Sequence, residues 1–275
     1  MGLSRYGPGF VTGPILTRQI AILIDGGFLL RRLPKLGLAG QDVEAVAGAV
    51  GRLCRRHVAM LTGSNAERNW HRHLYRIFFY DALPYEGAAH HPLKNQQIDF
   101  DKSDTAKFRR ALFAELRKKR NVALRLGKVV RHDDWSMPTR KLKPLLGTRD
   151  WIAGLDLDAV DDQGRITLDP GQLETVKRLQ KRWSELGDDD VALDLRQKGV
   201  DMRIGLDIAA LTLKRFVSTV VLVSGDSDFV PAAKLARREG LQFILDPLWQ
   251  SINDDLFEHI DGLQSGLPKP RPKPE

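Results

Sequence analysis

VVLVSGDSDFVPAAKLARREG, residues 220–240, is the stretch that decides the fold. Its leading apolar residues stop abruptly at Ser-Gly-Asp, which is typical of a buried parallel strand followed by a turn. Apolar residues then recur at helical spacing after Pro231, so a helix is expected up to about Gly240. A strand that leads straight into a helix predicts one β-α unit of a parallel sheet.

The same alternation recurs along the chain. Apolar runs predict further strands at about 20–24, 74–80, 122–130 and 241–245. Helical spacing predicts helices at about 41–61, 103–116, 173–183, 201–216 and 251–259. Strands that alternate with helices favour an α/β fold, with a central and mainly parallel sheet of about five strands.

Composition shifts suggest where this domain begins and ends. Residues 1–18 are rich in Gly and Pro and predict a flexible arm, and 82–101 predict a loop. The domain is expected to span 19–262, with an insertion at 132–195 where strand and helix patterns weaken. The Pro-rich, basic residues 263–275 predict a disordered tail.

Four carboxylates lie where strand-like runs end. Asp25 follows IAILI, Asp201 follows QKGV, and Asp226 and Asp228 follow VVLVSG. In an open α/β sheet, ligands bind in the crevice beyond the carboxyl ends of the strands, so we expect these side chains to share a site. Each could instead cap a helix, although capping alone does not need both Asp226 and Asp228.

Asp207 is a fifth candidate. It lies six residues after Asp201, ~240° around the predicted helix and on a largely apolar face. A carboxylate there must be paired, bound to a metal or placed at the end of the sheet. Arg203, four residues earlier, is an alternative partner that would give Asp207 a structural role.

Clustered carboxylates favour a hard divalent cation, because like charges repel unless a cation neutralises them. Mg²⁺ or Mn²⁺ suits ligands that are all oxygens, keeps several waters and binds through a few carboxylates plus a substrate phosphate. Such a metal activates water for phosphodiester hydrolysis. The sequence therefore predicts a metal-dependent hydrolase site formed by Asp25, Asp201, Asp207, Asp226 and Asp228.

The charge of the chain is unevenly distributed. The 275 residues carry a net charge of +8. Residues 102–149 contain 15 Lys and Arg against 4 Asp and Glu, a local charge of +11, whereas 150–195 carry a local charge of −7. Lys198 precedes the predicted Asp201 helix and is a candidate phosphate contact, with a solvated loop lysine as the alternative. A concentrated basic region attracts polyanions, so Arg117, Lys118, Lys119 and Arg120 are candidate RNA contacts. A solvated helix face is the alternative for the last four.

Other classes of protein are disfavoured. No GxxxxGK[ST] or GxGxxG nucleotide motif is present, and the one cysteine, Cys54, excludes an internal disulfide and fits the cytoplasm. IAILI is too short for a secretory or membrane segment, so we expect no membrane contact. An aromatic content of 7% gives little support for an extensive base-stacking platform.

Four segments resemble the NYN domain family, specifically its bacterial LabA-like group, within the PIN-like ribonucleases. They are IAILIDGGFLL (20–30), YRIFFYDALP (75–84), QKGVDMRIGLDIAAL (197–211) and VVLVSGDSDFVPAAKLARREG (220–240). The resemblance implies a three-layer α/β fold and a Mg²⁺- or Mn²⁺-dependent acidic site that cleaves RNA. By position it assigns that site to Asp25, Asp201, Asp226 and Asp228, with Asp207 at the helix acid position.

The leading hypothesis is therefore a metal-dependent endoribonuclease that acts on single-stranded or structured RNA. DNA stays open as a substrate, because a basic groove contacts phosphates and not the sugar. Exonucleolytic cleavage and a homodimer stay open as well. The alternative is a non-catalytic RNA-binding or regulatory module that retains the fold. A phosphatase with an aspartyl nucleophile is disfavoured, because Gly27 stands where its second carboxylate is needed.

Overall fold

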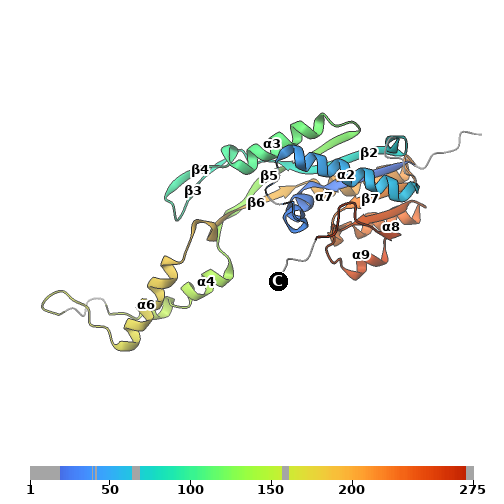
Figure 1. Ribbon diagram of the computed structural model, residues 1–275. Coiled ribbons are helices and arrows are strands. Elements are labelled where there is room, and N and C mark those ends of the chain that lie inside the picture. Colours follow the sequence, from blue (N-terminus) through green and yellow to red (C-terminus); the bar gives the residue numbers. More distant parts are fainter. Residues whose placement is uncertain (1–18, 39, 41, 64–68, 157–160, 271–275) are drawn as a thin grey trace, which may run out of the picture. The chain divides into compact units, whose positions relative to one another are not determined.

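The computed structural model describes residues 19–38, 40, 42–63, 69–156 and 161–270 (Figure 1). The predicted arm at 1–18 and the end of the predicted tail at 271–275 lie outside these residues. The chain forms two compact units. The sheet unit comprises Met1–Leu83, Phe108–Lys128 and Lys198–Glu275, and the second unit comprises Pro84–Lys107 and Val129–Gln197.

A seven-stranded sheet in the order β6-β5-β2-β1-β7-β8-β9 forms the core of the fold. Its strands are β1 (Ile20–Asp25), β2 (Leu74–Leu83), β5 (Val122–Ser136), β6 (Ala192–Lys198), β7 (Thr219–Val223), β8 (Gln242–Asp246) and β9 (Gly262–Leu263). All neighbouring pairs from β5 to β9 are parallel. The α/β class and the mainly parallel sheet are therefore confirmed.

Four strands of the described residues were not predicted from the sequence. β6 and β9 add two strands to the five expected, and the segment predicted as a loop at 82–101 holds an antiparallel hairpin of β3 (Ala88–His91) and β4 (Gln96–Asp99). β6 and the hairpin are rich in polar residues, and β9 has only two residues, so none shows the apolar run that marks a buried strand.

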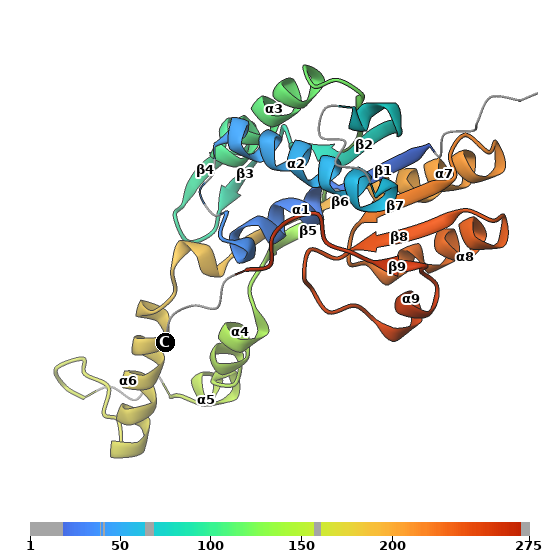
Figure 2. The same ribbon diagram turned by 45° about the vertical axis from the view of Figure 1, so that its right-hand side comes forward.

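Helices cover both faces of the sheet in the sheet unit (Figure 2). The helices of the chain are α1 (Gly26–Arg32), α2 (Val43–Thr62), α3 (Asp104–Arg117), α4 (Thr139–Leu146), α5 (Arg149–Ala153), α6 (Pro170–Ser184), α7 (Val200–Leu213), α8 (Val230–Arg238) and α9 (Asp254–Glu258). On one face, α1, α2 and α3 pack on alternate residues of β1, β2, β7 and β8. On the other face, α7 contacts β1 and β2, and α8 contacts β8. The sheet unit therefore has the three layers expected of a PIN-like fold.

Burial on both faces explains why the strands are continuous apolar runs. Ile22 and Ile24 of β1 belong to the core cluster with α2, whereas Ala21 and Leu23 point to the other face, and all four are fully buried. Gly26 follows the strand at a position without room for a side chain, since a Cβ atom there would lie 2.6 Å from the Phe79 ring and 2.7 Å from the Tyr80 carbonyl oxygen. Only glycine lets α1 begin this close to β2.

A buried carboxylate fastens the C-terminal segment to the sheet unit. Asp246 accepts hydrogen bonds from His57 Nε2 at 2.8 Å, Gly266 N at 2.9 Å, Ser265 Oγ at 2.9 Å and Leu248 N at 2.8 Å. Leu267 is buried in the core cluster. The prediction that the disordered tail begins at residue 263 is therefore wrong for 263–267, because Asp246 and the core hold these residues in place.

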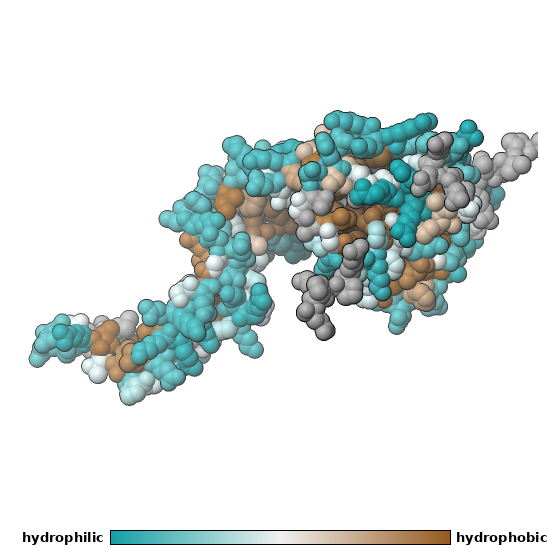
Figure 3. Space-filling view, viewed as in Figure 1, coloured by the Kyte–Doolittle hydropathy of each residue, from teal (hydrophilic) through white to brown (hydrophobic). Residues whose placement is uncertain are grey.

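The second unit contains the predicted insertion, the β3–β4 hairpin and the outer halves of β5 and β6. Lys94 pairs with Asp188 at 3.0 Å, and Lys141 pairs with Asp190 at 3.1 Å, so basic and acidic segments of this unit neutralise each other in part. Figure 3 shows brown, apolar areas among the teal over its helices. Leu146 of α4 is 60% exposed. Over the residues that the structure describes, every helix is too short or too polar to cross a membrane.

Replacing Asp246 with alanine is expected to destabilise the protein by about 3–5 kcal/mol, because His57 and two backbone N–H groups would lose a buried acceptor. Urea unfolding followed by circular dichroism measures this loss. Glu239→Ala is the control, since Glu239 pairs with Arg238 on the surface at 3.2 Å and its loss should cost less than about 1 kcal/mol. Equal stability of the two variants would contradict the expectation that the hydrogen bonds to Asp246 stabilise the fold.

Candidate functional site

The predicted aspartates gather at the carboxyl edge of the sheet. Asp25 is the last residue of β1, and Asp226 and Asp228 follow β7. β1 and β7 are neighbours with Ile24 opposite Val223, so the segments that leave these two strands begin side by side. Asp201 lies in the first turn of α7. Four carboxylates from three parts of the sequence therefore meet at one edge.

Asp25 is held rigidly at the start of α1. Its Oδ1 atom accepts a hydrogen bond from Phe28 N at 2.9 Å, and the Ser224 hydroxyl lies 3.5 Å from Oδ2. The helix-cap role that the sequence left open is thus real. Burial raises the pKa of Asp25, and so do Asp201 and Asp81, whereas the Phe28 amide and Arg31 oppose the increase.

Asp201, Asp226 and Asp228 form the exposed part of the cluster. Burial raises the pKa of Asp201, and the negative charges of Asp226 and Asp228 raise it further. Asp226 caps the short 3₁₀ helix Ser227–Phe229 by accepting from Asp228 N at 3.0 Å. Asp201 and Asp228 line a shared hollow of about 470 Å³. The cluster is therefore open to a ligand.

Asp207 has a different environment from the other four. Its Oδ2 atom accepts hydrogen bonds from Tyr80 Oη at 2.8 Å and from Arg125 Nε at 3.1 Å. Burial raises the pKa of Tyr80, and Asp207 raises it further, so the phenol keeps its proton and donates it. Arg203 was the alternative to a site role for Asp207, but it donates to the Gly199 carbonyl oxygen.

Two side chains near the site were absent from the predicted set. Asp81 of β2 follows Tyr80, the residue opposite Asp25 of β1. It is fully buried and pairs with Arg109 of α3. Arg31 of α1 acts electrostatically on both Asp25 and Asp201, which places a cation beside the cluster. The strand end at YRIFFYD was a signal for Asp81, whereas nothing in the local sequence distinguishes Arg31 from other helix arginines.

The predicted RNA contacts do not lie together. Arg117, Lys118, Lys119 and Arg120 precede β5, which runs parallel to β2, so they lie at the amino edge of the sheet, opposite the aspartates. Lys118 and Lys119 also pair with Glu115 at 3.1 and 2.8 Å. Lys198 is exposed and immediately precedes the Gly199–Asp201 turn that starts α7.

The donor atoms at the carboxyl edge fit a hard divalent cation. All are carboxylate oxygens, and their mutual repulsion shows in the raised pKa of Asp201. Among the described residues, the group with three ligand atoms within 4.8 Å of one another is Asp255 and Glu258 of α9 with the following His259, and not the strand-end aspartates.

Sequence comparison links part of this edge to a known family. Residues 174–261 match the NYN domain. The resemblance is thus confirmed for this part of the chain, and the NYN domain implies a nuclease-type fold. The matched range contains Asp201, Asp207, Asp226 and Asp228. Asp25 lies outside this range, and the pairing of β1 with β7 brings it to the same edge as Asp226 and Asp228.

Two further comparisons add no functional information. No curated protein shows significant similarity to the chain. A crystal structure of a protein of unknown function, VPA0982 from Vibrio parahaemolyticus RIMD 2210633, superposes with a TM-score of 0.39 and 13% identity, covering 90% of this chain and 91% of that one.

Asp25→Asn is expected to stabilise the metal-free protein at about pH 7 and to have little effect near pH 3. The pKa of Asp25 is higher in the folded state than in the unfolded state. The free energy of unfolding therefore falls as the pH rises from the pKa of the unfolded state through the pKa of the folded state. Asparagine keeps the helix cap and removes the charge. Urea unfolding in EDTA at both pH values measures the difference.

Asp42→Asn is the matched control. Asp42 caps α2 by accepting from Ala45 N at 2.7 Å, but it is exposed, so the same substitution should change stability little at either pH. Destabilisation of Asp25→Asn at neutral pH would show that the Asp25 charge is favourable in the folded protein, against our expectation.

Proposed function

We propose that the protein is a metal-dependent ribonuclease that hydrolyses RNA phosphodiester bonds at Asp25, Asp201, Asp226 and Asp228. The observation that carries the proposal is the convergence of these carboxylates from β1, β7 and α7 at one exposed edge. The nuclease-type fold of the NYN domain, which matches residues 174–261, supports it.

These carboxylates would hold Mg²⁺ or Mn²⁺, which when bound supplies positive charge for the phosphate and acidifies a water. Asp25 is the fixed member, since Phe28 N, the Ser224 hydroxyl and burial define its position. Asp201, Asp226 and Asp228 are exposed and can adjust to the substrate. Without a counter-ion their charge repels an RNA phosphate, so a bound divalent cation should strengthen RNA binding at this edge beyond what the basic side chains provide.

Asp207 is a positioning residue in this proposal and not a metal ligand. Its carboxylate ties α7 to β2 through Tyr80 and to β5 through Arg125. These contacts fix the helix that carries Asp201. Disengaging Asp207 for a metal would leave the buried Tyr80 hydroxyl without its acceptor, which costs about 1–3 kcal/mol.

In this proposal, the basic side chains that contact the RNA phosphate are Arg31 and Lys198. Arg31 acts on Asp25 and Asp201, and Lys198 precedes the turn before Asp201. Arg117, Lys118, Lys119 and Arg120 lie at the other edge, so they can touch only RNA that extends away from the cleaved bond. The cytoplasm remains the expected location.

The first test is cleavage of labelled single-stranded RNA by the purified protein with Mn²⁺, Mg²⁺ or EDTA. Asp226→Asn should lower the rate by at least about 100-fold, because loss of one charged ligand removes several kcal/mol of transition-state stabilisation. Asp42→Asn, the same change at an exposed helix cap, should cleave like the wild type.

Cleavage that persists in EDTA or in Asp226→Asn would refute the metal-dependent site. RNA binding without cleavage in any metal would favour the alternative, a non-catalytic RNA-binding or regulatory module. Cleavage of a matched single-stranded DNA at a similar rate would extend the substrate class to DNA.

The placement of the basic residues gives a second test. The logarithm of the association constant for single-stranded RNA falls linearly with the logarithm of the salt concentration. Lys198→Ala should make this slope shallower by about 0.7, the value for one lost phosphate contact. Lys118→Ala is the control, because Lys118 pairs with Glu115 at the amino edge and should leave the slope unchanged. Fluorescence anisotropy across a salt series in EDTA measures both, and a larger effect of Lys118→Ala would contradict our placement of the RNA.

A further inference from the structure

A second hollow, of about 540 Å³, lies in the sheet unit. Its lining includes the apolar side chains of Met60, Trp249 and Leu263, which are 39%, 43% and 47% exposed, and the polar side chains of Arg56 and Gln250. A mostly apolar hollow of this size with a few polar groups is typical of a ligand site.

The backbone presents Trp249 in an unusual way. Leu248 and Trp249 have φ angles of 49° and 64°, in the left-handed region that bulky residues avoid. Arg32 Nη2 donates to the Leu248 carbonyl oxygen at 2.7 Å, and Asp246 accepts from Leu248 N at 2.8 Å. Consecutive strained residues of this kind persist only where surrounding contacts enforce them, and they concentrate at functional sites.

The indole ring is fixed and still open to solvent. Trp249 Nε1 donates to the Leu267 carbonyl oxygen at 2.8 Å, which satisfies its polar atom. Trp249 remains 43% exposed, and Lys269 Nζ lies over the ring, 5.9 Å from its centroid. Proteins bind single-stranded nucleic acid by stacking a base on an exposed aromatic ring while nearby cations contact the phosphates, so the exposed lysine would leave the ring for a phosphate when a base stacks there.

Gln250 connects this hollow to the aspartate loop. A Cβ atom on Gly225 would lie 3.1 Å from Gln250 Nε2 and 3.0 Å from the Phe28 ring. Gly225 directly precedes Asp226, so the residue after Trp249 lies against the loop that carries two of the site carboxylates. Both features belong to the sheet unit.

We propose that Trp249 stacks on a nucleobase of the single-stranded RNA substrate, with Gln250 at the border between this base site and the aspartates. The inference rests on the proposed ribonuclease function and adds the substrate feature that it recognises, an unpaired base next to the cleaved phosphodiester. A base within a duplex is already stacked on both faces, so the site favours single strands.

The test is binding of a fluorescein-labelled oligoadenylate of about ten nucleotides, in EDTA, followed by anisotropy. Trp249→Ala should weaken binding by about 5- to 100-fold, the range that stacking of one base supplies. Trp249→Phe should retain most of the affinity, because it keeps a ring but loses the hydrogen bond to Leu267. Trp183→Ala, at a 56% exposed tryptophan of the second unit, should bind like the wild type.

The Phe variant separates stacking from structure. Equal loss in Trp249→Ala and Trp249→Phe would show that Trp249 only anchors Leu267, and wild-type affinity in Trp249→Ala would show that the ring does not bind RNA. Either result overturns the base site, as does failure of the wild type to bind the oligonucleotide. Melting temperatures of the variants verify that each is folded.

Binding in EDTA keeps this inference separate from catalysis. If Trp249→Ala weakens oligonucleotide binding but the wild type never cleaves RNA with Mn²⁺, the base site is supported and the ribonuclease proposal is refuted. Normal RNA cleavage by Trp249→Ala, with unchanged affinity, would preserve the ribonuclease and refute the base site.

Discussion

The pairing of β1 with β7 is the constraint on which the candidate site depends. Both strands are fully buried and parallel, so the chain must leave each of them at the same edge. Asp25 and the Gly225–Asp228 loop are separated by about 200 residues, and this register brings them together. The rest of the sheet unit serves to hold this edge, through α7 on one side and α1 on the other.

The edge is electrostatically unfavourable when it is empty. Burial and neighbouring carboxylates raise the pKa values of Asp25 and Asp201, so at neutral pH the protein bears the cost of charging them. Proteins retain such costs where function requires them, since replacement by uncharged residues would be more stable. Asp207 shows the contrast, because its Oδ2 atom accepts hydrogen bonds from both Tyr80 and Arg125, and the Arg125 guanidinium offsets its charge.

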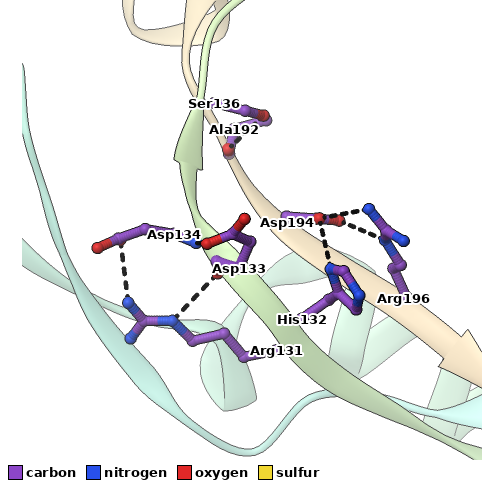
Figure 4. Close-up of polar contacts among 8 residues, drawn as sticks. All are labelled: Arg131, His132, Asp133, Asp134, Ser136, Ala192, Asp194 and Arg196. Carbon is purple, nitrogen blue, oxygen red and sulfur yellow. Dashed lines mark hydrogen bonds and ion pairs between the residues drawn. The ribbon is translucent and has the colours of Figure 1, made fainter.

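The contacts around β8 stabilise the fold and also hold Trp249, the residue of the proposed base site. Asp246 joins α2 to the C-terminal segment through His57 and Gly266, and it also holds Leu248 N. That contact helps to keep Leu248 and Trp249 in their left-handed conformation. In the second unit, by contrast, the β5–β6 ribbon carries exposed ion pairs of His132 and Arg196 with Asp194 (Figure 4), which contribute little to stability.

The sequence by itself determined the strands that are buried on both faces and the aspartates at their ends, because apolar runs and turn residues are local signals. It also predicted the helices that carry Asp201 and follow Asp228. Only the tertiary structure decided that Arg117 to Arg120 lie at the edge opposite the aspartates, that the Asp207 carboxylate accepts from Tyr80 and Arg125, and that Leu267 is part of the core. Strand order and long-range packing choose these partners, and no short stretch of sequence contains that information.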